Sequence, residues 1–135
     1  MRNVEGAAAY REARVLGRSP EQLVVLLYEH LLTCLRRAQA QMPAGDIEAR
    51  SQNLERASDI VFELLSSLDM DAGGEIASRL AALYAYFVGE IGALGLKPDN
   101  DRTERLIGLV SGLHESWARA ATPAPPEPVT AGGSP

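Results

Sequence analysis

The sequence predicts an all-α protein that folds as an antiparallel up-and-down four-helix bundle. Apolar residues recur three and four positions apart over four segments of about 20 residues, which is the period of an amphipathic helix. Turn-forming residues separate these segments by only a few positions, and short connections favour antiparallel neighbours. No stretch has the alternating pattern of a half-buried strand.

The first helix has the clearest start signal. Ser19 is a good N-cap, Pro20 suits the first helical position, and Gln22 completes a capping box with Ser19. We therefore expect a helix over residues 20–42, ended by the turn residues at 43–45.

This first helix is apolar around most of its circumference. The stripe expected to face the core contains Leu23, Leu27, Leu31, Cys34 and Ala38. Val25 and Leu32 lie outside that stripe, and Tyr28 lies between the two zones. Because a chain of 135 residues forms one core, we expect the outer zone to contact a partner.

The second helix repeats this excess of apolar surface. Asp46 is expected to cap it, and its pattern extends to about residue 68. Its main stripe consists of Leu54, Ala57, Val61, Leu64, Leu65 and Leu68. Ile60 and Phe62 lie at the edges of this stripe, so the apolar arc is again wide.

Gly73 and Gly74 predict a tight reversal before a third helix over residues 75–94, which Gly95 is expected to end. The stripe assigned to the core contains Ile76, Leu80, Leu83, Phe87, Ile91 and Leu94. A second stripe contains Ala77, Ala81, Tyr84 and Val88. This second stripe fits either a partner helix or another neighbour within the domain.

The fourth helix is expected to begin at residues 98–101. Its buried face contains Leu106, Leu109, Val110, Leu113 and Trp117. Gly108 and Gly112 weaken it by ~1 kcal/mol each relative to alanine, so it depends on packing.

The chain then divides into three parts: a flexible N-terminal arm over residues 1–18, the bundle over 19–121, and a disordered Pro-rich tail over 122–135. The arm either docks through Tyr10 or Val15 or is a frayed terminus.

Composition excludes several classes of function. The net charge is −5 and no basic run is present, which argues against a nucleic-acid partner. No uninterrupted apolar run approaches the ~20 residues of a membrane span, and the N-terminus lacks the order of a signal peptide, so we expect a cytoplasmic protein without membrane insertion. The single cysteine, Cys34, is expected to be a buried, inert thiol.

The sequence offers little chemistry. His30 and His114 belong to different helices, and neither has the Glu-x-x-His spacing of a metal site in a bundle. The sharpest enzyme hypothesis is a histidine phosphotransfer bundle that uses His30, but Leu31, Leu32 and Thr33 follow it in place of the expected lysine and glycine. We therefore expect neither catalysis, nor a metal, nor a cofactor.

The chain resembles the FliS family, cytoplasmic export chaperones for flagellin. The resemblance extends from about Tyr10 to Trp117. It depends on the order and spacing of Tyr10, Ser19-Pro20-Glu21-x-Leu23, Leu27-Tyr28, Leu65-x-x-Leu68-Asp69, Gly73-Gly74-Glu75-Ile76-Ala77-x-x-Leu80-x-x-Leu83-Tyr84-x-Tyr86 and Trp117.

The resemblance implies a helical bundle that binds the C-terminal segment of flagellin, prevents its premature polymerisation and presents it to the flagellar type III export apparatus. The surplus apolar stripes suit a partner that wraps around the bundle as amphipathic helices. Our candidate residues for the flagellin grooves are Val25, Tyr28, Leu32, Ile60, Leu64, Ala77, Ala81, Tyr84 and Val88. We expect a monomer or weak dimer; the alternative is a structural bundle that associates with itself through the same stripes.

Overall fold

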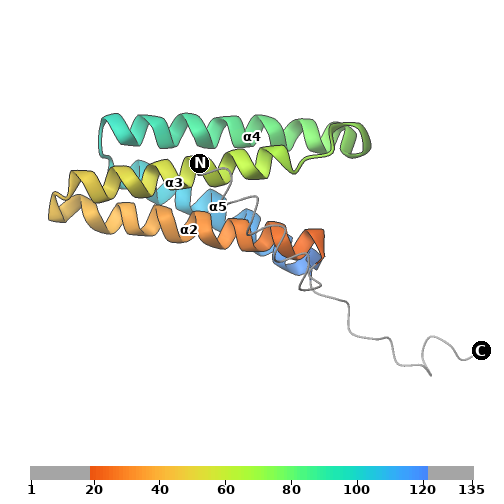
Figure 1. Cartoon of the computed structure of the whole chain (residues 1–135), viewed down its shortest axis with the longest axis horizontal. Coiled ribbons are helices and arrows are strands. Elements are labelled where there is room, and N and C mark those ends of the chain that lie inside the picture. Colours follow the sequence, from red (N-terminus) through yellow and green to blue (C-terminus); the bar gives the residue numbers. More distant parts are fainter. Residues whose placement is uncertain (1–18, 122–135) are drawn as a thin grey trace, which may run out of the picture.

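The described residues, 19–121 of a computed structural model, form four helices that run up and down beside one another (Figure 1). These are α2 (Pro20–Ala44), α3 (Ile47–Ser66), α4 (Met70–Leu96) and α5 (Asn100–Ala121). The predicted fold class is confirmed. The expectations for the arm at 1–18, including Tyr10, and for the tail at 122–135 lie outside the described residues.

The start of α2 matches its sequence signal in detail. The Ser19 side chain accepts a hydrogen bond from the Gln22 N–H at 3.2 Å, and the Gln22 side chain accepts one from the Ser19 N–H at 2.9 Å. At the other end, α2 continues two residues further than expected, through Pro43 to Ala44. Gly45 then ends it with a φ of 71°, a left-handed conformation that glycine adopts without strain.

The predicted glycine break is present at Gly74, but α4 begins at Met70, five residues before the expected start at residue 75. After Asp69 caps a first helical turn, Gly74 takes a φ of 53° and bends the chain into the long part of α4. Gly95, however, does not end α4, which continues to Leu96. The helix ends because Pro98 disfavours the helical conformation in the residue before it, and Lys97 is accordingly extended.

The first helix of the bundle, α2, packs against two neighbours, α3 and α5, whereas α4 packs mainly against α3. On one side of α2, Gln41 accepts a hydrogen bond from Asn53 of α3. On another side, Gln39 donates to Glu104 of α5 at 2.6 Å, and Glu29 contacts His114 of α5 at 3.2 Å. The central position of α2 explains why apolar residues cover most of its circumference.

The expected partner stripe of α2 is therefore wrong at Leu32. Its side chain is only 5% exposed and belongs to the hydrophobic core. Glu29 and Gln39, which lie on the same side of α2 as Leu32, both contact α5, so the α5 helix covers this stripe. Val25 and Leu27 are both half-buried, which removes the expected contrast between an inner and an outer stripe.

The core face of α4 falls between the two stripes that the sequence suggested. Its buried residues are Ala77, Tyr84, Phe87, Ile91 and Leu94. Ile76, assigned to the core, is 71% exposed. The buried Arg50 of α3 donates to the Leu94 carbonyl at 2.9 Å, and this antiparallel register places Ile76 beyond the last residue of α3.

Two further corrections concern α3 and α5. Leu64, a candidate groove residue on α3, is fully buried, and Leu109, assigned to the buried face of α5, is 48% exposed. Ile107 and Thr103 are buried on α5 although neither was assigned to the core.

We predict that Leu32→Glu destabilises the chain by roughly 3 kcal/mol or more, because it places a carboxylate under α5. A circular dichroism melt should show a midpoint roughly 10 °C lower than that of the wild type. Ala40→Glu, an exposed change on the same helix, is the matched control and should leave the midpoint nearly unchanged. A wild-type melting curve for Leu32→Glu would show that α5 does not cover this side chain in solution.

Candidate functional site

The surface of α4 is unusually apolar for a helix on the outside of a bundle. Met70–Leu96 is long and apolar enough, by length and composition alone, to cross a membrane, although core helices of soluble proteins pass the same weak test. Only 22% of the apolar window is buried here, so α4 is not a core helix. Our expectation of no membrane insertion stays a prediction. Much of the apolar surface of α4 has no neighbour among the described residues.

One side of α4 is identified by Glu90, whose carboxylate contacts Arg102 of α5. Leu83 and Ile76 precede Glu90 by seven and fourteen residues, spacings that keep side chains on the same side of a helix. Leu83 is half-buried, and so is its neighbour on this side, Leu80. This side of α4 thus carries the apolar residues Ile76, Leu80 and Leu83, interrupted by Arg79, which is exposed and lies eleven residues before Glu90.

The matching side of α5 is identified by Arg102. Leu109 and Leu113 follow it by seven and eleven residues, and Trp117 lies one turn further on. Leu113 and Trp117 are half-buried. Figure 1 shows α5 running away from α4 after their connecting turn, and the two helices contact each other far less than the other consecutive pairs do. The α5 residues therefore lack a covering helix from α4.

We name these two helix faces the α4–α5 side. Its residues are Ile76, Leu80, Leu83, Leu109, Leu113 and Trp117. No other helix of the described chain covers this side completely. Its apolar side chains would therefore be better accommodated by contact with an additional helix than by contact with water.

A pair of tyrosines joins α2 to α4 beneath the surface. The Tyr28 and Tyr84 hydroxyls lie 2.8 Å apart, and both side chains are almost completely buried. Burial raises the pKa of both phenols. The hydrogen bond with Tyr84 raises the pKa of Tyr28 further, and the Trp117 side chain acts in the opposite direction. This contact gives each buried hydroxyl a partner and holds α2 and α4 together across the core.

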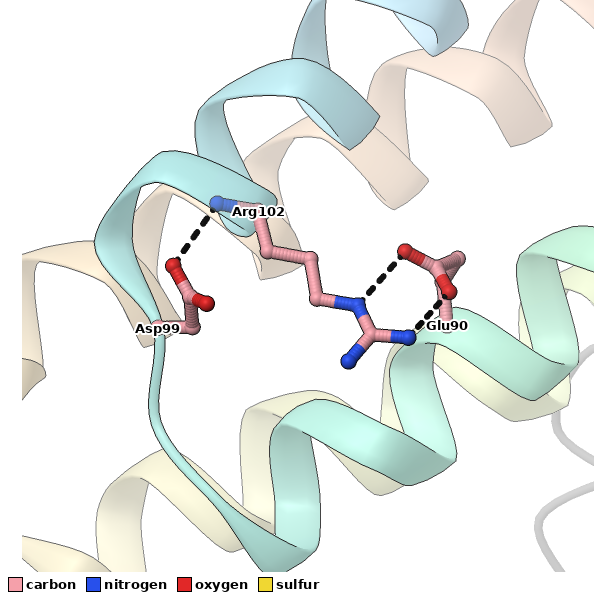
Figure 2. Close-up of polar contacts among 3 residues, drawn as sticks. All are labelled: Glu90, Asp99 and Arg102. Carbon is pink, nitrogen blue, oxygen red and sulfur yellow. Dashed lines mark hydrogen bonds and ion pairs between the residues drawn. The ribbon is translucent and has the colours of Figure 1, made fainter.

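A charged contact closes the α4–α5 side near the turn (Figure 2). The Arg102 guanidinium donates two hydrogen bonds to the Glu90 carboxylate, at 2.8 Å from Nε and 2.7 Å from Nη2. The Asp99 carboxylate accepts from the Arg102 backbone N–H at 3.0 Å and so caps α5. The hydrogen bond with Arg102 lowers the pKa of Glu90, which keeps the carboxylate charged over a wide pH range.

The structure divides the sequence-predicted groove residues into two groups. Five are buried within the bundle: Tyr28, Leu32, Leu64, Ala77 and Tyr84. Four are half-buried: Val25, Ile60, Ala81 and Val88. The buried five do not line a surface groove in this packing, and their contact with a partner stays a prediction. The half-buried four keep their status as predictions.

The α4–α5 side was not predictable from the sequence, because its six residues occupy ordinary core positions of amphipathic helices. Nothing in their spacing reveals that α4 and α5 diverge. His30, the residue considered for phosphotransfer, is exposed on α2, and Cys34 is buried as expected. Among residues 19–121, no group of three or more His, Cys, Asp or Glu side chains could hold a metal ion.

Comparison with known proteins identifies a family. The profile of the family described as "Flagellar protein FliS" matches residues 2–124. A protein of Salmonella typhimurium named "Flagellar secretion chaperone FliS" is 33% identical over 122 residues, which cover 87% of this chain and 90% of that protein. The protein of the same name from Campylobacter jejuni is 32% identical over 117 residues, covering 87% and 91%. The Bacillus subtilis protein of that name is 26% identical over 112 residues, covering 83% of each chain.

The buried tyrosines predict a loss of stability at high pH. Unfolded tyrosines ionise near pH ~10, whereas Tyr28 and Tyr84 hold their protons to higher pH in the folded state. The contribution of these two tyrosines to the free energy of unfolding should therefore be fully retained below pH ~10 and fall as the pH rises above it. Urea unfolding between pH about 8 and about 11 measures this slope. The double variant Tyr28→Phe/Tyr84→Phe should have a shallower slope, while Tyr86→Phe, an exposed change, should keep the wild-type slope. Equal slopes for the double variant and the wild type would contradict the assignment.

Proposed function

The chain belongs to the FliS family, and we propose from this premise that it is a cytoplasmic export chaperone for flagellin. In this role it binds the C-terminal segment of flagellin, prevents premature polymerisation and presents the subunit to the flagellar type III export apparatus. The family match and the curated relatives named flagellar secretion chaperones support the class of function. The finer steps, and the identity of the client, are our proposal.

The observation that carries the proposal is the α4–α5 side. The Ile76 side chain is 71% exposed and the Leu109 side chain is 48% exposed, and the other four residues of this side are half-buried. An amphipathic helix from a client can cover such a surface with its own apolar face, at spacings of three and four residues. We therefore place the flagellin segment along the α4–α5 side, with α4 as the principal contact helix.

This arrangement explains chaperone action without any covalent chemistry. A disordered segment that folds on the bundle has its apolar residues covered, so those residues are unavailable for contact with other flagellin subunits. Ordering the segment costs ~2–5 kcal/mol of the gross interaction energy, so a large interface can still dissociate. Reversible binding of this kind suits a chaperone that must give up its client to an export apparatus.

Two exposed apolar residues test the location. Leu109→Glu places a charge on the α4–α5 side at a position that is already 48% exposed, so the melting curve should stay close to that of the wild type. Calorimetric titration with the flagellin C-terminal segment should show affinity at least ten-fold weaker, a loss of ~1.4 kcal/mol or more.

Ile47→Glu is the matched control, because Ile47 is exposed at the start of α3 and lies outside the α4–α5 side. It should leave both the melting curve and the affinity unchanged. If Leu109→Glu binds normally while Ile47→Glu does not, the client lies elsewhere on the bundle. If the wild-type chain itself does not bind any flagellin segment, the proposed function is wrong.

A further inference from the structure

The turn between α4 and α5 differs from the other two turns of the bundle. Consecutive helices α2 and α3, and α3 and α4, pack against each other along their lengths, but α4 and α5 contact each other little. Near this turn, Glu90 and Arg102 make two parallel hydrogen bonds in the fork geometry that favours specific orientation (Figure 2). The directional Glu90–Arg102 contact thus joins α4 and α5 at a place where the apolar packing between them is weak.

Arg102 is itself held in place on both of its sides. Asp99 caps its backbone N–H, and the next residue, Thr103, is buried with its hydroxyl donating to the Asp99 carbonyl at 2.8 Å. The first turn of α5 is therefore fixed to the connecting segment, and Arg102 joins that turn to α4. Glu90 has 14% of its side chain exposed and Arg102 has 40%, so the pair is partly shielded and salt screens it less than a fully exposed pair.

The Glu90–Arg102 contact lies at the turn end of both helices, so a small change there affects the α4–α5 side further along the helices. α5 has 22 residues and is roughly 33 Å long, so a tilt of about 10° at its first turn would displace its far end by roughly 6 Å. Leu109, Leu113 and Trp117 follow Arg102 along that length. α5 also packs against α2, where Gln39 contacts Glu104 and Glu29 contacts His114. Within the range of tilt that this packing allows, the distance of the three α5 residues from Leu83 and Ile76 of α4 depends on the angle at which α5 leaves the turn.

We infer that the Glu90–Arg102 pair is a positioning element that fixes the separation of α4 and α5 and thereby prepares the α4–α5 side for its client. Its effect on affinity rests on the proposed function, whereas its effect on helix separation does not. A surface held in its binding geometry before contact binds more tightly than one that must be ordered during binding. Loss of either partner should widen the range of helix separations and weaken the complex.

Helix separation is measured directly with spin labels on the full chain. Ser78 of α4 and Ser116 of α5 are exposed and lie in the far halves of the two helices, so labelled cysteines there report their distance, with Cys34→Ala to remove the native thiol. Glu90→Gln should broaden the distance distribution. Glu75→Gln is the matched control, because Glu75 pairs with Arg79 on the same helix but both side chains are 77% exposed. That control should leave the distribution unchanged.

Affinity is measured on unlabelled variants by titration with the flagellin C-terminal segment. Glu90→Gln and Arg102→Gln should each weaken binding by about three-fold or more. The charge-swapped variant Glu90→Arg/Arg102→Glu should regain much of the loss, although Asp99 and Arg105, which also face this pair, oppose the reversed charges. Arg102→Lys keeps the charge without the two-pronged contact and should fall between wild type and Arg102→Gln.

Each outcome has a distinct meaning. Unchanged distances in Glu90→Gln would overturn the inference, as would broadened distances with unchanged affinity. Should Arg102→Gln fail to fold by circular dichroism, the milder Arg102→Lys takes its place in the titration. If the wild type binds no flagellin segment, the proposed function fails, while the distance measurement still decides whether the pair positions the helices.

Discussion

The packing of α2 between α3 and α5 is the constraint on which the rest of the bundle depends. α2 is apolar around most of its circumference because it buries one side against α3 and another against α5. Because α5 packs on α2, the helix against which α4 mainly packs is α3. The open α4–α5 side is therefore a consequence of how α2 uses its apolar surface, and it arises although α4 is the most apolar helix in composition.

Polar contacts fix the register of the helices, which apolar packing alone does not define. The buried Tyr28–Tyr84 hydrogen bond ties α2 to α4 across the core, and buried Arg50 donates to the Leu94 carbonyl near the end of α4. A positive charge is favourable at a helix C-terminus, and the last turn of α4 has no basic residue of its own. These contacts fix register, whereas the hydrophobic core supplies most of the stabilisation, since apolar burial is non-directional.

In the function that we propose, client binding and bundle stability use the same kind of surface. Side chains such as Leu80 and Trp117 pack against the core on one side and remain accessible on the other. A chaperone for a segment that folds on binding needs such a surface, because the client must exchange water contacts for apolar contacts in order to become helical. A fully enclosed bundle would be more stable but would offer the segment nothing to bind.

Sequence alone determined the fold class, the four helices and the starts of α2, α3 and α5. Caps and turns are local: Ser19, Asp46 and Gly74 act through residues a few positions away, so their roles follow from spacing. The resemblance that the sequence carries also indicated the family. The neighbour of each apolar stripe does not follow from nearby residues in the chain, because Leu32 and Leu109 occupy equally apolar positions on amphipathic helices. Only the tertiary structure decided that α5 covers Leu32 and that the divergence of α4 from α5 exposes Leu109, since the angle between two helices depends on contacts between residues far apart in the chain.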